Sequence, residues 1–410
     1  MMIRLKATVN SYDWGKASEQ SLVARYAKSG SDMTDLDPNL KYSELWVGTH
    51  PNGPSSVFGT GESLKHWLGE HPQADLSLGE DGGLCFLFKI LSIGKALSIQ
   101  AHPNQKRARE LFATRPDLYK DPNHKPEMAC ALTPFEALLG FQSIERIVFH
   151  VEHTPELLGL VSEQVWRDLR AAAESIQPST RRAALKDFFS QVLSSDPKQV
   201  ALRVDELVTR LLTAPPNSEM DHLNTLALRL HEEFPHDVGI FCAYIMCYEK
   251  LSPGDAVFLT SNEPHAYLSG ECVEVMANSD NVIRAALTPK FKDLDELNTM
   301  LTYNEPQPDN NQTWHPRQIL RPTKRDSFTV VFTPPDAEVW EFQLERTTLG
   351  RRNPPYKLAA SQYTSVLFVT EGQGKLGEYA VVPGAAFLLP AGQRVLVSGE
   401  LVLYRVTRKA

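Results

Sequence analysis

The spacing of apolar residues changes twice along the 410-residue chain, and this change constrains the fold more than any other feature. Between about Ile147 and Leu230, apolar residues recur at intervals of three and four, as in TPELLGLVSEQVWRDLRAAAESI and DPKQVALRVDELVTRLL, which predicts helices. On both sides the chain instead contains short apolar segments bounded by Gly or Pro, which predicts strands. We therefore expect a mainly β protein with an inserted α-helical domain.

The strand segments predict two related β-barrels, because their length and regular spacing are typical of sandwiches and barrels. Residues 382–392, VPGAAFLLPAG, repeat the strand-and-turn pattern of residues 252–266, SPGDAVFLTSNEPHA, but contain no histidine to match His265. One barrel is expected to carry a site and the other not. A short helix is predicted from Gln105 toward Ala113, with Asn104 as its N-cap. The expected domains are residues 1–149 with 236–320, residues 150–235, and residues 321–410.

Charge and composition exclude some classes of function. A formal net charge of -8 argues against a general nucleic-acid binder, although it leaves room for a local basic pocket that holds a small anion. The N-terminal residues do not resemble a secretory signal, and no apolar stretch is long enough to span a bilayer, so we expect a cytoplasmic protein that binds neither nucleic acid nor membrane. The five scattered cysteines predict free, mostly buried thiols.

The run from His265 to Lys290, HAYLSGECVEVMANSDNVIRAALTPK, combines many candidate functional residues. Glu274 lies between two valines, so in a strand its side chain points to the opposite face from both. The residues around Asp280 predict a turn, and Arg284 follows on the next apolar segment. Two strands and a turn would bring an imidazole, carboxylates and two cations close together. This inventory suits an anionic substrate held beside a metal.

Four side chains with nitrogen or oxygen ligand atoms form a candidate metal site. Gln100 and His102 are two residues apart on an apolar segment and therefore share a strand face. Glu127 ends the loop YKDPNHKPE, and His265 follows a turn. Two imidazoles, a carboxylate and an amide oxygen suit Zn²⁺ or another divalent first-row ion. Each residue alone also has an ordinary structural explanation, and spacing does not decide between the two.

Several cations and aromatic residues carry the same ambiguity. His124 and Lys125 belong either to a site or to a basic loop that faces water. Lys89 lies inside the apolar segment LCFLFKILS, so it must form an ion pair, extend to water or serve a site, unless it blunts an edge strand. Trp14 in YDWGK and Glu44 in SELWVGTHPNGPS either pack the mouth of the barrel or border a pocket.

Five motifs resemble those of type I mannose-6-phosphate isomerases (phosphomannose isomerases). Residues 119–127, YKDPNHKPE, and residues 265–290 resemble two signature stretches of that family. YDWGK, SELWVGTHPNGPS and LSIQAHP resemble further family motifs in the same order, and the helical segment and C-terminal β region match the family layout. The resemblance implies cupin-like (jelly-roll) β-barrels: a catalytic barrel with an inserted helical domain, and a C-terminal barrel without a metal site.

The resemblance also implies residue roles, position by position. One Zn²⁺ per chain would be bound by Gln100, His102, Glu127 and His265. Catalytic positions would be Arg284, Lys125, His124, Asp280 and Glu274. Substrate-binding positions would be Ser98, Lys89, Lys290, Tyr267 and Trp14.

The implied reaction interconverts D-mannose 6-phosphate and D-fructose 6-phosphate through an enediolate, and so feeds mannose into GDP-mannose and glycan synthesis. Arg284 would stabilise charge at the reacting end, while Lys290 and Ser98 would hold the phosphate. His124 would assist ring opening. The proton carrier stays open among Lys125, Glu274 and Asp280. We expect a monomer whose partner is the small sugar phosphate alone.

The chain departs from the family pattern at three places, of which one is the segment IMCYEK, residues 245–250, without the asparagine expected near Cys247. Asn104-Gln105 stands where Asp-Lys is usual, and Ala286 stands where Gly is usual. None of these positions is an implied ligand, so these changes bear on kinetics and substrate preference more than on reaction type. Two other functions fit the same residues: a non-catalytic, metal-binding cupin that senses sugar phosphates, and an Fe(II) cupin oxygenase.

Overall fold

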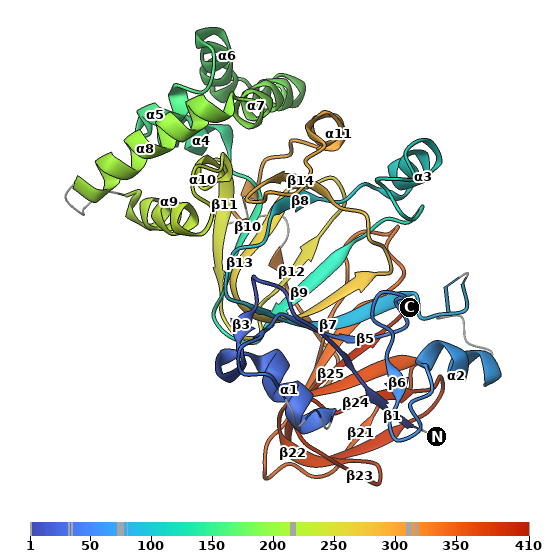
Figure 1. The fold of residues 1–410 in the computed structure, drawn as a ribbon. Coiled ribbons are helices and arrows are strands. Elements are labelled where there is room, and N and C mark those ends of the chain that lie inside the picture. Colours follow the sequence, from blue (N-terminus) through green and yellow to red (C-terminus); the bar gives the residue numbers. More distant parts are fainter. Residues whose placement is uncertain are drawn as a thin grey trace.

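The computed structural model describes residues 2–31, 33, 36–71, 78–79, 81–213, 219–308, 314–315 and 319–409. Two β-barrels lie against each other, and a group of helices covers the side of the first barrel that is remote from the second (Figure 1). The fold is therefore mainly β with an inserted helical domain, as expected. Within the described residues, no helix is long and apolar enough to cross a membrane.

The first barrel carries the predicted catalytic residues. Its longest strand, β13, pairs with β7 on one side and β9 on the other, and the remaining strands extend the sheet around these three. Its strands are β2 (Thr8–Asn10), β5 (Glu44–Val47), β7 (Phe86–Ile93), β8 (Ile99–Ala101), β9 (Glu127–Ala131), β10 (Phe135–Phe141), β11 (Met246–Leu251), β12 (Ala256–Leu259), β13 (His265–Ala277), β14 (Ile283–Ala286) and β17 (Ile319–Leu320).

The C-terminal barrel also includes the beginning of the chain. Strand β1 pairs with β24, so residues 3–6 lie in this sheet although they were expected with the catalytic domain. Its strands are β1 (Ile3–Lys6), β6 (Ser56–Val57), β18 (Thr323–Lys324), β19 (Thr329–Phe332), β20 (Gln343–Leu349), β21 (Tyr356–Leu358), β22 (Ser365–Leu376), β23 (Tyr379–Val381), β24 (Ala386–Leu389) and β25 (Val395–Thr407). Two further pairs are β3 (Lys16–Ala17) with β4 (Lys41–Tyr42), and β15 (Gln307–Pro308) with β16 (Trp314–His315).

Most helices belong to one insertion between β10 and β11, where the helical periodicity predicted them. They are α4 (Ile144–Glu152), α5 (Pro155–Leu158), α6 (Glu163–Ala173), α7 (Pro178–Leu193), α8 (Pro197–Thr213), α9 (Asp221–Glu233) and α10 (Gly239–Cys242). Outside the insertion lie the 3-10 turn η1 (Ser18–Gln20) and the helices α1 (Leu22–Gly30), α2 (Leu64–Glu70), α3 (Gln105–Thr114) and α11 (Leu294–Met300). Asn104 caps α3 as predicted, because its side chain accepts a hydrogen bond from the Arg107 backbone at 2.9 Å.

A shared apolar core joins the two barrels. Val273 and Val275 of β13 pack in the same cluster as Phe368 of β22, and the rings of Phe88 and Phe368 lie 5.1 Å apart between centroids. Because strand side chains alternate between faces, Glu274 points the other way, into the catalytic barrel. The described cysteines are all free and buried, as expected.

The two barrels repeat the same backbone geometry. Gly254 and Gly384 have φ angles of 94° and 91°, and Gly270 and Gly399 have φ angles of 107° and 104°. Such angles suit glycine because a Cβ atom would strain them. The repeat noticed in the sequence is therefore also present in the three-dimensional structure.

Candidate active site

A cavity of about 690 Å³ opens into the catalytic barrel. Its wall combines strands β5, β7, β8, β9, β13 and β14 with the loops that join them. Nearly all predicted site residues line it: Trp14, Lys89, Ser98, Gln100, Lys125, Glu127, His265, Tyr267, Glu274, Asp280, Arg284 and Lys290. His102 contacts Glu127 and His265 at the inner end of this group.

Three buried side chains converge as a group that could hold a metal ion. The Nε2 atoms of His102 and His265 each lie 3.5 Å from Oε2 of Glu127, and one ligand atom from each residue lies within 4.8 Å of the others. His102 directly follows β8, His265 begins β13 and Glu127 begins β9, and β13 pairs with both of the other strands. Gln100 stands directly opposite His265 in the sheet, so its amide is placed to act as a fourth ligand.

The hydrogen bonds of the two imidazoles leave the metal-facing atoms free. Nδ1 of His102 donates to the Asn281 carbonyl at 2.7 Å, and Nδ1 of His265 lies 3.2 Å from the Glu263 carbonyl. In each ring Nε2 is buried and has no hydrogen-bond partner among the described residues. Burial lowers the pKa of His102 to about 4, so this imidazole is neutral and its lone pair is available. Backbone carbonyls that orient imidazoles in this way are typical of metal sites.

Lys125 and Glu127 form an ion pair beside the imidazoles. The Lys125 ammonium lies 3.1 Å from Oε1 of Glu127. Burial alone would raise the pKa of Glu127, but Lys125 and His102 outweigh it and hold that pKa well below its usual range. The carboxylate is therefore ionised, as a metal ligand must be.

Lys89 and Glu274 form a second buried ion pair on adjacent strands. Their charged atoms lie 3.1 Å apart, and the ammonium sits 5.0 Å from the centre of the Trp46 ring. Burial would lower the pKa of Lys89, but Glu274 and Glu44 raise it, so this lysine stays charged. Burial raises the pKa of Glu274, and Lys89 offsets only part of that rise. Lys89 thus faces the cavity and is not an edge-strand lysine.

Asp280 is held at the mouth of the cavity by residues that the sequence did not single out. His50 Nε2 lies 3.4 Å from the Asp280 carboxylate, and Asn52 donates to the same carboxylate at 2.9 Å. Burial lowers the pKa of His50. Both residues lie in the motif SELWVGTHPNGPS. The histidine between two turn-forming segments of this motif could have indicated a site residue.

Two further cations on the cavity wall are available to a ligand. Arg284 on β14 makes no side-chain hydrogen bond or ion pair with any described residue, and the same is true of the exposed Lys290. Burial lowers the pKa of Arg284 from its usual high value. Lys95, which the sequence reasoning also missed, lines the same cavity. Ser98 donates to the Gln100 amide oxygen at 3.2 Å.

His124 is placed differently from the expectation. Of the described residues on its loop, Lys125 lines the cavity and His124 does not. The His124 imidazole instead points toward the C-terminal barrel, where it contacts Glu341. Adjacent residues of an extended segment point in opposite directions, so one cannot reach the substrate when the other does. The expected role of His124 in ring opening therefore has no support in this geometry.

The departures from the family pattern lie away from the cavity wall. Ala286 is buried on β14 against Gly239, and its φ angle is not positive. Asn104 caps α3, and Gln105 donates to the Pro122 carbonyl at 2.7 Å. These residues support the walls of the site and do not contact its interior.

Fold and site together define a β-barrel protein with a buried histidine–carboxylate group, suited to a metal ion, in a polar cavity. Residues 2–144 match the family model described as phosphomannose isomerase type I, catalytic domain, and residues 160–246 match its helical insertion domain. The chain belongs to the type I phosphomannose isomerase family, and it is an isomerase.

The relatives match along nearly the whole chain. A mannose-6-phosphate isomerase of Cryptococcus neoformans is 38% identical over 91% of this chain and 89% of its own length. The mannose-6-phosphate isomerase of Mus musculus is 36% identical over 98% and 95%. The crystal structure of the apo enzyme from Salmonella typhimurium is 28% identical, with a TM-score of 0.80 over 100% of this chain and 99% of that one. A structure described as zinc-bound holo mannose 6-phosphate isomerase covers 100% of both chains, at 28% identity and a TM-score of 0.81.

Proposed function

We propose that this isomerase interconverts D-mannose 6-phosphate and D-fructose 6-phosphate and requires Zn²⁺. The observation that carries the proposal is the pair of buried, unpartnered imidazole Nε2 atoms aimed at the Glu127 carboxylate, in a cavity that also holds unpaired cations. His102, Glu127 and His265, with Gln100, would hold the ion. Bound Zn²⁺ would act as a Lewis acid toward the oxygens on C1 and C2 of the sugar.

The protein side chains divide the remaining tasks. Lys290 and Lys95 supply positive charge for the phosphate, and this remote binding orients the reacting carbons. Arg284, which has no side-chain hydrogen bond or ion pair with the described residues, stabilises the negative charge of the enediolate. Lys89 and Glu274 fix the face of β7 and β13 against which the sugar lies.

We assign proton transfer between C1 and C2 to Lys125. Its ammonium lies in the cavity 3.1 Å from Glu127 and therefore beside the proposed ion, whereas Asp280 lies at the mouth of the cavity, held by His50 and Asn52. Glu274 lies on β13 and contacts Lys89, so it stays the next candidate. A Lys125→Met variant should bind zinc but lose turnover by about a hundredfold or more, since general acid–base groups contribute on that scale. A variant with normal turnover would remove Lys125 from this role, and Glu274→Gln would then be the next test.

The function is tested by isomerisation of mannose 6-phosphate with and without a chelator, together with zinc quantification. We expect chelation to abolish turnover, zinc to restore it, and His265→Ala to lose both zinc and activity. His66→Ala is a matched control, because His66 is exposed on α2 in a second His/Glu group, with Glu62 and Glu70, that is not buried. Zinc-independent turnover would contradict the proposed cofactor. Binding of zinc and sugar phosphate without turnover would indicate a sensor.

A further inference from the structure

A buried contact joins the loop of residues 121–126, which contains His124 and Lys125, to the C-terminal barrel. We call this segment the catalytic loop. Nε2 of His124 donates to Oε1 of Glu341 at 2.6 Å, and the two residues are 4% and 2% exposed. They are 217 positions apart in the sequence. Glu341 lies between β19 and β20, outside the cavity wall. The contact therefore holds the catalytic loop on the side that faces away from the cavity.

Glu341 is itself fixed from several directions. Its Oε2 accepts a hydrogen bond from the Trp340 backbone at 3.0 Å, and its carbonyl accepts one from the Cys85 thiol at 3.3 Å. The Trp340 carbonyl in turn accepts from the Lys409 backbone near the end of the chain. These contacts restrict the movement of the Glu341 carboxylate. The hydrogen bond from His124 therefore fixes the position of the imidazole.

The opposite side of the loop is held by the catalytic barrel. The Asn281 amide donates to the Asp121 carbonyl at 2.8 Å, and the Asn123 amide donates to the Asn278 carbonyl at 3.0 Å. Residues 121–126 therefore lie between the turn that follows β13 and the carboxylate of Glu341. The turn fixes the loop beside the metal ligands, and Glu341 fixes its other side.

The loop carries the groups that the reaction needs. Lys125 follows His124 directly, and Glu127 begins β9 two residues later. A rotation of the loop about its axis would move the Lys125 ammonium and the Glu127 carboxylate together. Rates of well-oriented reactions fall by about a hundredfold for displacements near 1 Å, so a small movement here is costly.

We propose that Glu341 is a positioning residue, through which the C-terminal barrel holds the catalytic loop so that Lys125 stays at the reacting carbons. The proposal rests on the proposed isomerase function. It assigns a task to the barrel in whose repeat no histidine matches His265.

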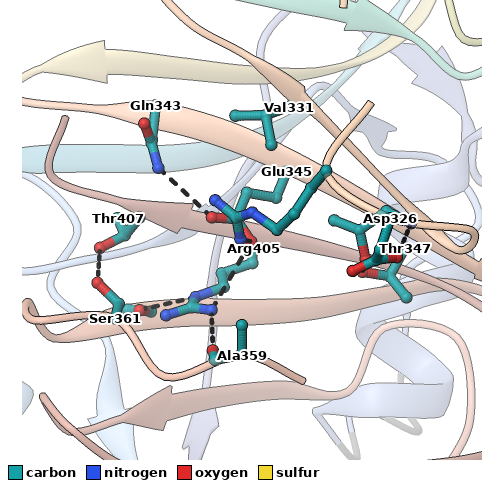
Figure 2. Close-up of polar contacts among 12 residues, drawn as sticks. Asp326, Val331, Gln343, Glu345, Thr347, Ala359, Ser361, Arg405 and Thr407 are labelled. Atoms are coloured by element: carbon teal, nitrogen blue, oxygen red, sulfur yellow. Dashed lines mark hydrogen bonds and ion pairs between the residues drawn. The ribbon is translucent and has the colours of Figure 1, made fainter. Parts of the chain in front are cut away.

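The chain offers a matched control on the same barrel. Glu345 lies four residues after Glu341, is 1% exposed and stands opposite Arg405 in the sheet, with a charged-atom separation of 3.7 Å (Figure 2). Arg405 also donates to the Ala359 carbonyl at 2.7 Å, as Figure 2 shows. Glu345→Gln therefore removes a buried charge from the C-terminal barrel without touching the catalytic loop.

The test measures kcat and KM for mannose 6-phosphate in zinc-loaded variants. Glu341→Ala should lower kcat by about tenfold or more and leave KM within about threefold, because the cations placed for the phosphate lie on other elements. Glu341→Gln should recover most of the loss, since its amide oxygen still accepts from His124. His124→Ala combined with Glu341→Ala should be no slower than either single variant, as expected of two residues that act through one contact.

Hydrogen exchange of residues 119–128 gives a readout that does not depend on turnover. Glu341→Ala should exchange faster there, whereas Glu345→Gln should match the wild type in exchange and in kcat. Equal losses of kcat in both variants would show a general effect of the C-terminal barrel and overturn the proposal, as would an unchanged kcat in Glu341→Ala. If the wild type does not turn over mannose 6-phosphate but Glu341→Ala still exchanges faster than the wild type at residues 119–128, only the proposed function is contradicted.

Discussion

At the scale of single residues, the site is built from charges that are buried in pairs. Lys89 and Glu274 lie on adjacent strands and face each other across the ladder. Lys89 stands in an apolar segment, so the sequence showed that it needed a partner but not which one. Glu274 could be assigned to the opposite face from its valine neighbours because strand side chains alternate. The pairing itself depends on the register of two segments nearly 200 residues apart.

This pair predicts a strong, non-additive effect on stability. Lys89→Met leaves the Glu274 carboxyl buried without its cation, so the free energy of unfolding should fall by about 3–5 kcal/mol. Lys89→Met combined with Glu274→Met should be less destabilised than the sum of the single changes, because no charge is then left unpaired. Urea unfolding measures all three variants.

An exposed ion pair serves as the control. Lys65 contacts Asp81 on the surface, with side chains that are 45% and 59% exposed, so Lys65→Met should cost no more than about 1 kcal/mol. If Lys65→Met and Lys89→Met lowered the free energy of unfolding equally, burial would not explain the effect of Lys89→Met.

At the scale of elements, α4 is attached to the segment by which the chain leaves the helical insertion. Nδ1 of His150 donates to the Tyr244 carbonyl at 2.8 Å, and the imidazole is 1% exposed. Burial lowers the pKa of His150 to about 4, although the bond to Tyr244 acts in the opposite direction. The helical periodicity located α4, whereas nothing in the sequence indicated this contact, because it joins the two ends of a long insertion.

The His150 contact predicts an acid-sensitive stability. The unfolded chain, with a histidine pKa near 6.5, binds more protons than the folded protein between about pH 4 and pH 6.5. The contribution of His150 is therefore complete above about pH 6.5 and falls by up to about 3 kcal/mol as the pH is lowered to about 4. In zinc-free protein, His150→Gln should lose less stability than wild type between pH 7 and pH 4.5, as measured by urea unfolding.

A neighbouring histidine gives the comparison. His153 lies at the exposed C-terminal end of the same helix, and its imidazole contacts the Phe149 carbonyl. His153→Gln should keep the wild-type dependence on pH. Identical slopes in all three proteins would show that His150 titrates normally in the folded state.

At the scale of the whole molecule, two barrels of the same design share one core but have different interiors. The matching positive φ angles at Gly254 and Gly384, and at Gly270 and Gly399, show the common backbone. The order of helical and strand segments, the N-cap at Asn104 and the histidine missing from the second repeat were all readable from the sequence. Each of these features depends on neighbours within a few residues or on a repeated local pattern.

The sequence by itself determined the class of fold, the identity of the ligand-bearing motifs and the face of β13 that carries Glu274. Only the tertiary structure decided that the imidazoles of His102 and His265 converge on Glu127. It also decided that His50 contacts Asp280, and that His124 faces Glu341 and not the cavity. The physical reason is distance along the chain. Periodicity and turn chemistry act over a few residues, whereas these contacts join segments that only the register of the sheets and the packing of the two barrels bring together.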